Sequence, residues 1–149
     1  MGTSMGATLQ PDDLNDMVRN EWPESQFVCE AVGEDSATAY IDIREEVLRP
    51  GGYVSGPTLF AAADAALWFL AAVAAGEPVP MALTSDLSIR YLRPAIGERV
   101  YAHATLEKGS RRTVIGSVSI WMDDQREAPS AIAQGSYVLP HDTQGGGGS

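Results

Sequence analysis

The apolar residues near the N-terminus recur at a helical spacing. Leu14, Met17 and Val18 are three or four positions apart within residues 11–22, so they share one face of a helix. Asp12, at the start of this segment, is a residue type that caps a first turn. The pattern predicts a short amphipathic helix.

Two segments after this helix alternate between apolar and polar positions. Residues 37–43 read Ala-Thr-Ala-Tyr-Ile-Asp-Ile, a period of two that is typical of a half-buried strand. Residues 26–32 are a second candidate strand, and the polar residues 34–36 suit a turn. Because the link is short, we expect an antiparallel hairpin.

The longest apolar run, residues 59–75, contains a single charge, Asp64. Pro57 suits the first turn of a helix, and Gly76 and Pro78 suit its end. The run is short and alanine-rich for a bilayer span, and a carboxylate in lipid is costly. A helix buried on every side of a soluble protein is therefore the better interpretation.

Four strand-like segments and their turns complete the chain. The order is one short helix, two strands, one long helix and four strands, so helices and strands do not alternate and a doubly wound parallel sheet is disfavoured. We expect an α+β fold in which an antiparallel sheet of five to six strands wraps around one long central helix. The four segments are residues 81–92, 100–108, 113–122 and 130–139.

The chain length of 149 residues indicates one domain, which we place at residues 11–140. Residues 1–10 are interpreted as a tag remnant and a disordered N-terminus. Residues 141–149 are interpreted as a flexible tail ending in the linker-like GGGGS. No charged stretch precedes an apolar core at the N-terminus, so we expect no secretory signal and no membrane association.

Composition narrows the function classes further. The formal net charge of −10 argues against a nucleic-acid surface. A single cysteine, Cys29, excludes a disulfide framework, and we expect it to be a small buried apolar residue in a cytoplasmic protein. With only two histidines, of which His103 is expected to be an ordinary strand residue, we predict no metal site.

Asp64 is the most informative position. An unpaired buried carboxylate costs several kcal/mol, so Asp64 needs a partner, a perturbed pKa or a water-lined site. It is either a functional carboxylate or a structural one that pairs with an arginine or caps another segment.

Ser55 and Gly56 precede the helix, where free N–H groups can bind an anion or a carbonyl oxygen, although a simple helix cap is the alternative. Gly56 and Asp64 are about 12 Å apart along the helix axis, too far for both to touch one atom of a substrate, and a second subunit could bring the two groups together across an interface.

A basic cluster flanks the predicted turn at residues 109–110. Lys108, Arg111 and Arg112 suit phosphate groups, and the alternative is a solvated turn. Charge is unevenly distributed, since residues 1–50 hold 11 acids and 3 bases whereas residues 90–112 hold 6 bases and 2 acids. The acidity of the whole chain therefore does not exclude an anionic ligand.

Three segments in order resemble PaaI-like acyl-CoA thioesterases of the hotdog fold. Residues 55–66 (SGPTLFAAADAA) are similar to the His-Gly-Gly…Ala-Asp-x-Ala signature of that family. Residues 82–95 (ALTSDLSIRYLRPA) resemble its next strand, and residues 106–112 (LEKGSRR) its next hairpin turn. The likeness runs from about residue 38 to residue 139.

The resemblance implies roles for particular residues. Asp64 would be the nucleophile or the base that activates water, the Gly56 N–H of a partner subunit would be the oxyanion donor, and Thr84 would position the water. A homodimer with shared sites is implied, and a homotetramer is typical. No cofactor is implied, because coenzyme A is part of the substrate. The implied substrate-binding residues are Ser55, Tyr53, Trp68, Lys108, Arg111 and Arg112.

The chain departs from the signature at two positions. Ser55 replaces its histidine and Pro57, which has no N–H, replaces its second glycine; the asparagine often found upstream of the helix is also absent. These changes keep a non-catalytic acyl- or CoA-binding protein as an alternative. A hydratase on the same fold needs a histidine near the helix, and residues 1–102 contain none.

Overall fold

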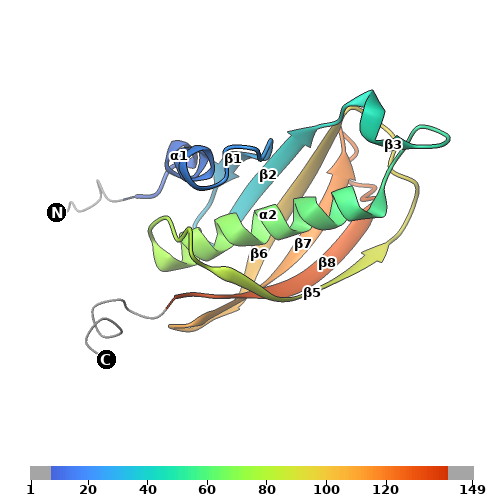
Figure 1. The fold of residues 1–149 in the computed structure, drawn as a ribbon. Helices are drawn as coiled ribbons and strands as arrows, with labels where there is room; N and C mark the ends of the chain where they lie inside the picture. Colours follow the sequence, from blue (N-terminus) through green and yellow to red (C-terminus); the bar gives the residue numbers. More distant parts are fainter. Residues whose placement is uncertain (1–7, 141–149) are drawn as a thin grey trace.

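A computed structural model describes residues 8–140 of the chain (Figure 1). The short helix α1 (Pro11–Glu21) and the long helix α2 (Gly56–Ala75) pack with a six-stranded antiparallel sheet. The predicted tail, residues 141–149, and the predicted tag remnant lie outside the described residues. Six strands make up the sheet: β1 (Val28–Val32), β2 (Ser36–Asp42), β5 (Leu83–Tyr91), β6 (Arg99–Gly109), β7 (Thr113–Met122) and β8 (Ala131–Val138).

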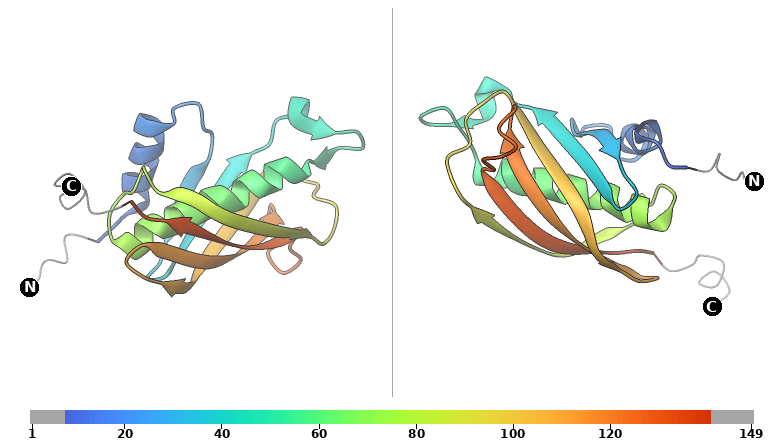
Figure 2. Two further views of the ribbon diagram at one scale, coloured as in Figure 1. Left: turned by 60° about the horizontal axis from the view of Figure 1, so that its bottom comes forward. Right: turned by 180° about the vertical axis from the view of Figure 1, so that it is seen from behind.

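The strands lie side by side in the order β1-β2-β6-β7-β8-β5. The sheet curves around α2, and no helix covers its outer face in the part of the chain that the structure describes (Figure 2). This arrangement confirms the predicted antiparallel α+β fold with one central helix. The predicted strands are correct to within about two residues at each end.

Some local predictions were incomplete or wrong. The sequence pattern missed a one-turn 3-10 helix at Glu45–Val47 and a small hairpin of β3 (Leu48–Arg49) and β4 (Tyr53–Val54). Helix α1 begins at Pro11, as predicted, but its N-cap is Gln10 and not Asp12, and the Gln10 N–H donates to Asp13 Oδ2 at 2.8 Å. The reason is that Pro11 occupies the first helical position, where a missing N–H costs nothing.

Helix α2 is long and apolar enough to cross a membrane, and it is the one such helix within residues 8–140. Most of it lies in the hydrophobic core against β2, β6 and β7, which confirms that it is a core helix. It ends at Gly76, whose φ of 80° lies in the left-handed region that favours glycine.

A pair of glycines lets α2 approach the sheet. Gly116 of β7 and Gly135 of β8 are cross-strand partners on the face toward the helix. A Cβ at Gly135 would lie 2.6 Å from the Asp86 carbonyl oxygen and 3.1 Å from a methyl group of Leu67, and one at Gly116 would also meet Leu67. The absence of side chains at the two glycines therefore leaves the space into which Leu67 of α2 packs.

We expect Gly135→Ala to destabilise the fold by about 1–3 kcal/mol, because the added methyl group meets backbone that cannot move cheaply. Urea denaturation measures the effect. Gly109→Ala is the matched control, since a Cβ there has its nearest neighbour at an ordinary 3.7 Å. Equal stability of the two variants would contradict a requirement for glycine at position 135.

Cys29 joins the N-terminal helix to the sheet. The Asn15 side chain of α1 accepts from the Cys29 N–H at 2.8 Å and donates to the Cys29 carbonyl oxygen at 3.0 Å. The residue is 2% exposed, which confirms the predicted burial. Burial, with a smaller effect from Glu30, raises the pKa of Cys29 to about 12.

A thiol with this pKa carries almost no thiolate at pH 8, so we expect it to resist alkylation in the folded protein. Iodoacetamide should modify Cys29 at least about 100-fold more slowly in native protein than in urea-unfolded protein, as followed by mass spectrometry. Comparable rates would mean that α1 opens readily from β1.

Candidate active site

Asp64 lies about two turns after the start of α2, faces away from the deepest part of the core, and is half-buried. Two hydroxyl groups hold its side chain. Thr84 Oγ1 donates to Asp64 Oδ1 at 2.7 Å, and the Tyr137 hydroxyl donates to the same oxygen at 2.8 Å. The carboxylate therefore has two neutral donors, and neither is an arginine.

Sheet register explains why these two donors meet. Thr84 of β5 and Tyr137 of β8 are direct cross-strand partners. Within β8, Tyr137 follows the alternation of Ala131, Ala133 and Gly135 toward the helix. A side chain opposite Tyr137 lies on the same face of the sheet, so Thr84 also faces α2.

A β-bulge in β5 makes this pairing possible. The register shifts between Thr84 and Asp86, which leaves Ser85 as the extra residue. Leu87 and Ile89 pack on the core, so strict alternation would turn Thr84 to the outer face. The bulge reverses the alternation and directs Thr84 to the carboxylate.

Tyr137 is the residue that the sequence analysis missed. It is only 5% exposed, and its hydroxyl oxygen also lies 3.2 Å from the Asp64 carbonyl oxygen. Burial, together with the negative charge of Asp64, raises the pKa of Tyr137 well above its usual value. The hydroxyl thus stays protonated and can serve as a donor throughout the neutral range.

The carboxylate opens into a cavity of about 420 Å³. Trp68 of α2 forms part of its wall and lies near Trp22, with ring centroids 6.4 Å apart. The Trp68 indole N–H donates to the Val79 carbonyl oxygen at 3.2 Å, which fixes the ring. Apart from Glu21, Asp64 and Thr84, the lining is mainly apolar and aromatic: Trp22, Ala61, Ala65, Trp68, Pro80, Met81, Ala82, Leu83 and Tyr137.

Gly56 and Tyr53 line a different cavity, of about 510 Å³, with Leu59 and Tyr91. The Tyr91 hydroxyl donates to the Gly56 carbonyl oxygen at 3.0 Å. Ser55 is the N-cap of α2, because its hydroxyl accepts from the Thr58 N–H at 3.2 Å. Ser55 is not among the lining residues of either cavity. One chain thus keeps Gly56 apart from Asp64, as the helix rise requires.

The basic residues Lys108, Arg111 and Arg112 lie at the β6–β7 turn, away from the lining of the Asp64 cavity. The turn is at the same end of the sheet as the candidate site, because Val138 pairs with Leu83 on one side and with Thr113 on the other. The structure therefore places the basic turn and the carboxylate toward the same end of the sheet.

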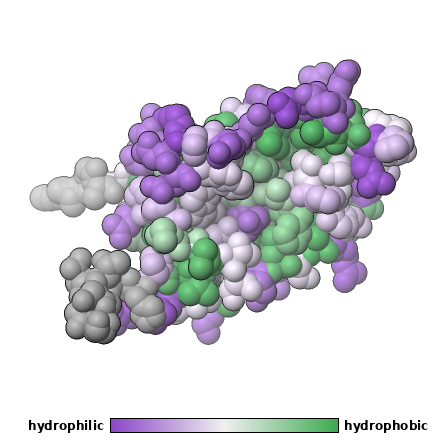
Figure 3. Space-filling view, in the orientation of Figure 1, coloured by the Kyte–Doolittle hydropathy of each residue, from purple (hydrophilic) through white to green (hydrophobic). Residues whose placement is uncertain are grey.

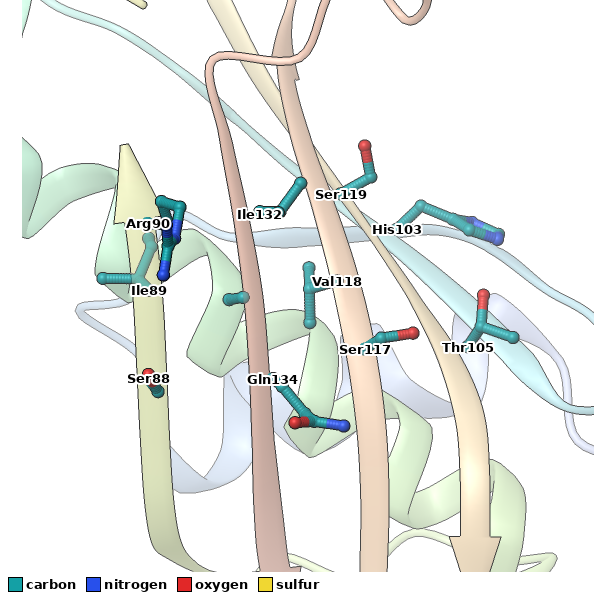
Figure 4. A pocket seen from close by; sticks show the side chains of 11 residues that line it. Ser88, Ile89, Arg90, His103, Thr105, Ser117, Val118, Ser119, Ile132 and Gln134 are labelled. Atoms are coloured by element: carbon teal, nitrogen blue, oxygen red, sulfur yellow. The ribbon is translucent and has the colours of Figure 1, made fainter. Parts of the chain in front are cut away.

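The outer face of the sheet carries a third depression, of about 490 Å³, which Figure 4 shows with α2 behind the strands. Ser117, Ser119, Gln134 and His103 are among its lining residues. His103 Nδ1 is 2.7 Å from Thr38 Oγ1, and burial lowers the His103 pKa, with a further contribution from Arg126. No group of three or more potential metal ligands occurs within residues 8–140.

The chain is similar in sequence and in fold to proteins described as thioesterases. A family model described as the thioesterase superfamily matches residues 51–129. A proposed thioesterase from a Silicibacter species is 28% identical, with a TM-score of 0.76 over 89% of this chain and 92% of that chain. No curated protein matches the sequence.

Two further solved structures are similar in fold. A thioesterase from Haemophilus influenzae is 19% identical, with a TM-score of 0.75 over 91% of this chain and 96% of that chain. A mutant of the phenylacetic acid degradation protein PaaI from Thermus thermophilus is 20% identical, with a TM-score of 0.64 over 84% of this chain and 99% of that chain. At these identities the likeness concerns the fold alone.

Proposed function

The chain belongs to the thioesterase superfamily, and from this premise we propose that it is a cytoplasmic acyl-CoA thioesterase. It would hydrolyse the thioester to a carboxylic acid and free CoA without a cofactor. The observation that carries the proposal is the Asp64 carboxylate, held by Thr84 and Tyr137 at the wall of an apolar cavity. Such a cavity suits an acyl chain, and the carboxylate suits acid–base or nucleophilic work on its carbonyl.

As a base, Asp64 takes a proton from water while the water oxygen bonds to the thioester carbon. The tetrahedral intermediate then collapses, the C–S bond breaks, and the CoA thiolate leaves and receives the proton. As a nucleophile, Asp64 instead bonds to the carbonyl carbon and expels the thiolate, and water then cleaves the resulting anhydride. Thr84 contributes in either route by orienting the carboxylate.

The oxyanion donor would be the Gly56 N–H of a second subunit. On one chain Gly56 and Asp64 line separate cavities, so a complete site needs two copies. Figure 3 shows hydrophobic surface on the face over α2 and β5. Exposed apolar side chains at or beside the ends of β5 include Met81 and Leu83, each 70% exposed, and Tyr91. Exposed apolar surface at the edge strand β5 supports a homodimer.

The remaining predicted site residues have places in this assembly. The basic turn of Lys108, Arg111 and Arg112 would bind the phosphate groups of CoA, because guanidinium and ammonium groups suit phosphate. Trp68 would contact the acyl group, and Tyr53 would contact substrate beside the Gly56 donor. Ser55 would contribute indirectly, because as the N-cap of α2 it fixes the helix start at which the Gly56 N–H lies.

A dimer of dimers would form through the outer face of the sheet. The depression on that face is lined by small and polar side chains such as Ser117 and Ser119, and no helix covers it within the described residues. Sedimentation velocity distinguishes a homotetramer from a homodimer.

Asp64→Asn should lower kcat for acyl-CoA hydrolysis by about 10²–10⁴-fold, because the amide can neither accept the proton nor attack. A panel of short, medium, long and aryl acyl-CoA substrates, with thiol release as the readout, measures the loss. The melting temperature should stay close to that of the wild type. Tight CoA binding without turnover by the wild type would favour the non-catalytic alternative.

The shared site predicts complementation between two inactive variants. Gly56→Pro removes the proposed donor N–H, and Gly56→Ala is its matched control, since it adds a Cβ but keeps the N–H. Mixed dimers of Gly56→Pro with Asp64→Asn contain one site with both native groups. Co-refolding the two should restore about a quarter of the wild-type activity, as random pairing in a twofold dimer requires. If the mixed dimers recover no activity, the Gly56 N–H and Asp64 do not come from different chains, which contradicts the shared site.

A further inference from the structure

We infer that Tyr137 is a positioning residue for the proposed hydrolysis: with Thr84 it holds Oδ1 of Asp64, so that Oδ2 is the oxygen that reacts. This inference rests on the proposed function and deepens it. Neither the family match nor the three similar segments of sequence assigns a role to Tyr137.

The hydrogen bonds distinguish the two carboxylate oxygens. Within residues 8–140, the Asp64 side chain accepts two hydrogen bonds, and both are accepted by Oδ1. They come from Thr84 at 2.7 Å and from Tyr137 at 2.8 Å. A carboxylate oxygen has two lone-pair sites, and here both are engaged. Oδ2 keeps its lone pairs for a proton or for a carbonyl carbon.

The donors are neutral, which preserves the reactivity of the carboxylate. A cation beside Asp64 would stabilise its charge strongly and make it a poorer base and nucleophile. The residues that line the cavity include no lysine and no arginine. Two hydroxyl groups can therefore orient the carboxylate without neutralising it.

Tyr137 is the more rigid of the two donors. Its ring is buried, whereas Thr84 is exposed on the edge strand. Its hydroxyl oxygen lies between the side-chain and backbone oxygens of Asp64, at 2.8 and 3.2 Å. The ring thus links β8 to one residue of α2 and limits rotation of that side chain about its bonds to the helix.

Tyr137→Phe tests the inference, because it removes the hydroxyl and keeps the ring. We expect kcat for the best acyl-CoA substrate to fall about 10–100-fold while KM changes less than about twofold, since the lost contact acts on Asp64 and not on substrate. Tyr40→Phe is the matched control: it removes a hydroxyl from the outer face of β2 and should leave kcat and KM unchanged.

The outcomes separate the inference from the proposed function. Absence of hydrolysis by the wild type across the substrate panel overturns the proposed function and the inference with it. An active wild type with unchanged kcat in Tyr137→Phe, or with a change in KM alone, overturns the inference and leaves the proposed function standing. If Tyr137→Phe does not fold, Thr84→Val removes the other Oδ1 donor without a change of shape, and it should show the same fall in kcat at constant KM.

Discussion

The molecule depends on a helix that is apolar on nearly every side and carries one carboxylate. Its core side approaches the sheet closely because Gly116 and Gly135 leave room for Leu67. At Asp64 the helix needs hydrogen-bond donors, because a half-buried carboxylate without them would cost several kcal/mol. Thr84 and Tyr137 meet that requirement from neighbouring strands. Close packing of the helix therefore also brings the donors within reach of the carboxylate.

Much of the fold could be predicted from local patterns. Helix α2 ends at Ala75 as expected, because Gly76 adopts the left-handed conformation that stops a helix. Strands with strict alternation, such as β2, were identified to within a residue. The small β3–β4 hairpin was missed, because two-residue strands such as Tyr53–Val54 have no periodicity to detect.

The geometry of the candidate site could be predicted only in part. Asp64 was identified from its contrast with the helix around it. Alternation alone would have turned Thr84 outward with Asp86, and the bulge at Ser85 has no signature in the sequence. Tyr137 belongs to a strand of predictable alternation, but its contact with Asp64 depends on register across the sheet and on the depth of α2. Both are tertiary properties that a single sequence does not encode locally.

The departures at Ser55 and Pro57 affect the helix start more than the carboxylate. The Ser55 hydroxyl caps the first turn of α2 by accepting from the Thr58 N–H, so this residue has a structural use. Pro57 has no N–H to offer and the Thr58 N–H donates to Ser55, so the Gly56 N–H is the donor that remains for a substrate among the first three residues of α2. Under the proposed function a single backbone donor would stabilise the oxyanion, and hydrolysis would depend strongly on Asp64.

The same bulge connects chemistry to assembly. By reversing the alternation, the bulge turns Thr84 toward Asp64. It also turns Leu83 away from the core, so that Leu83 is 70% exposed. Leaving a leucine in water forgoes about 1.5–3 kcal/mol of burial. A partner subunit that covers the β5 edge would recover part of that free energy. It would also supply the Gly56 donor that one chain holds too far from its own carboxylate. Formation of the dimer and completion of the site would then be one event.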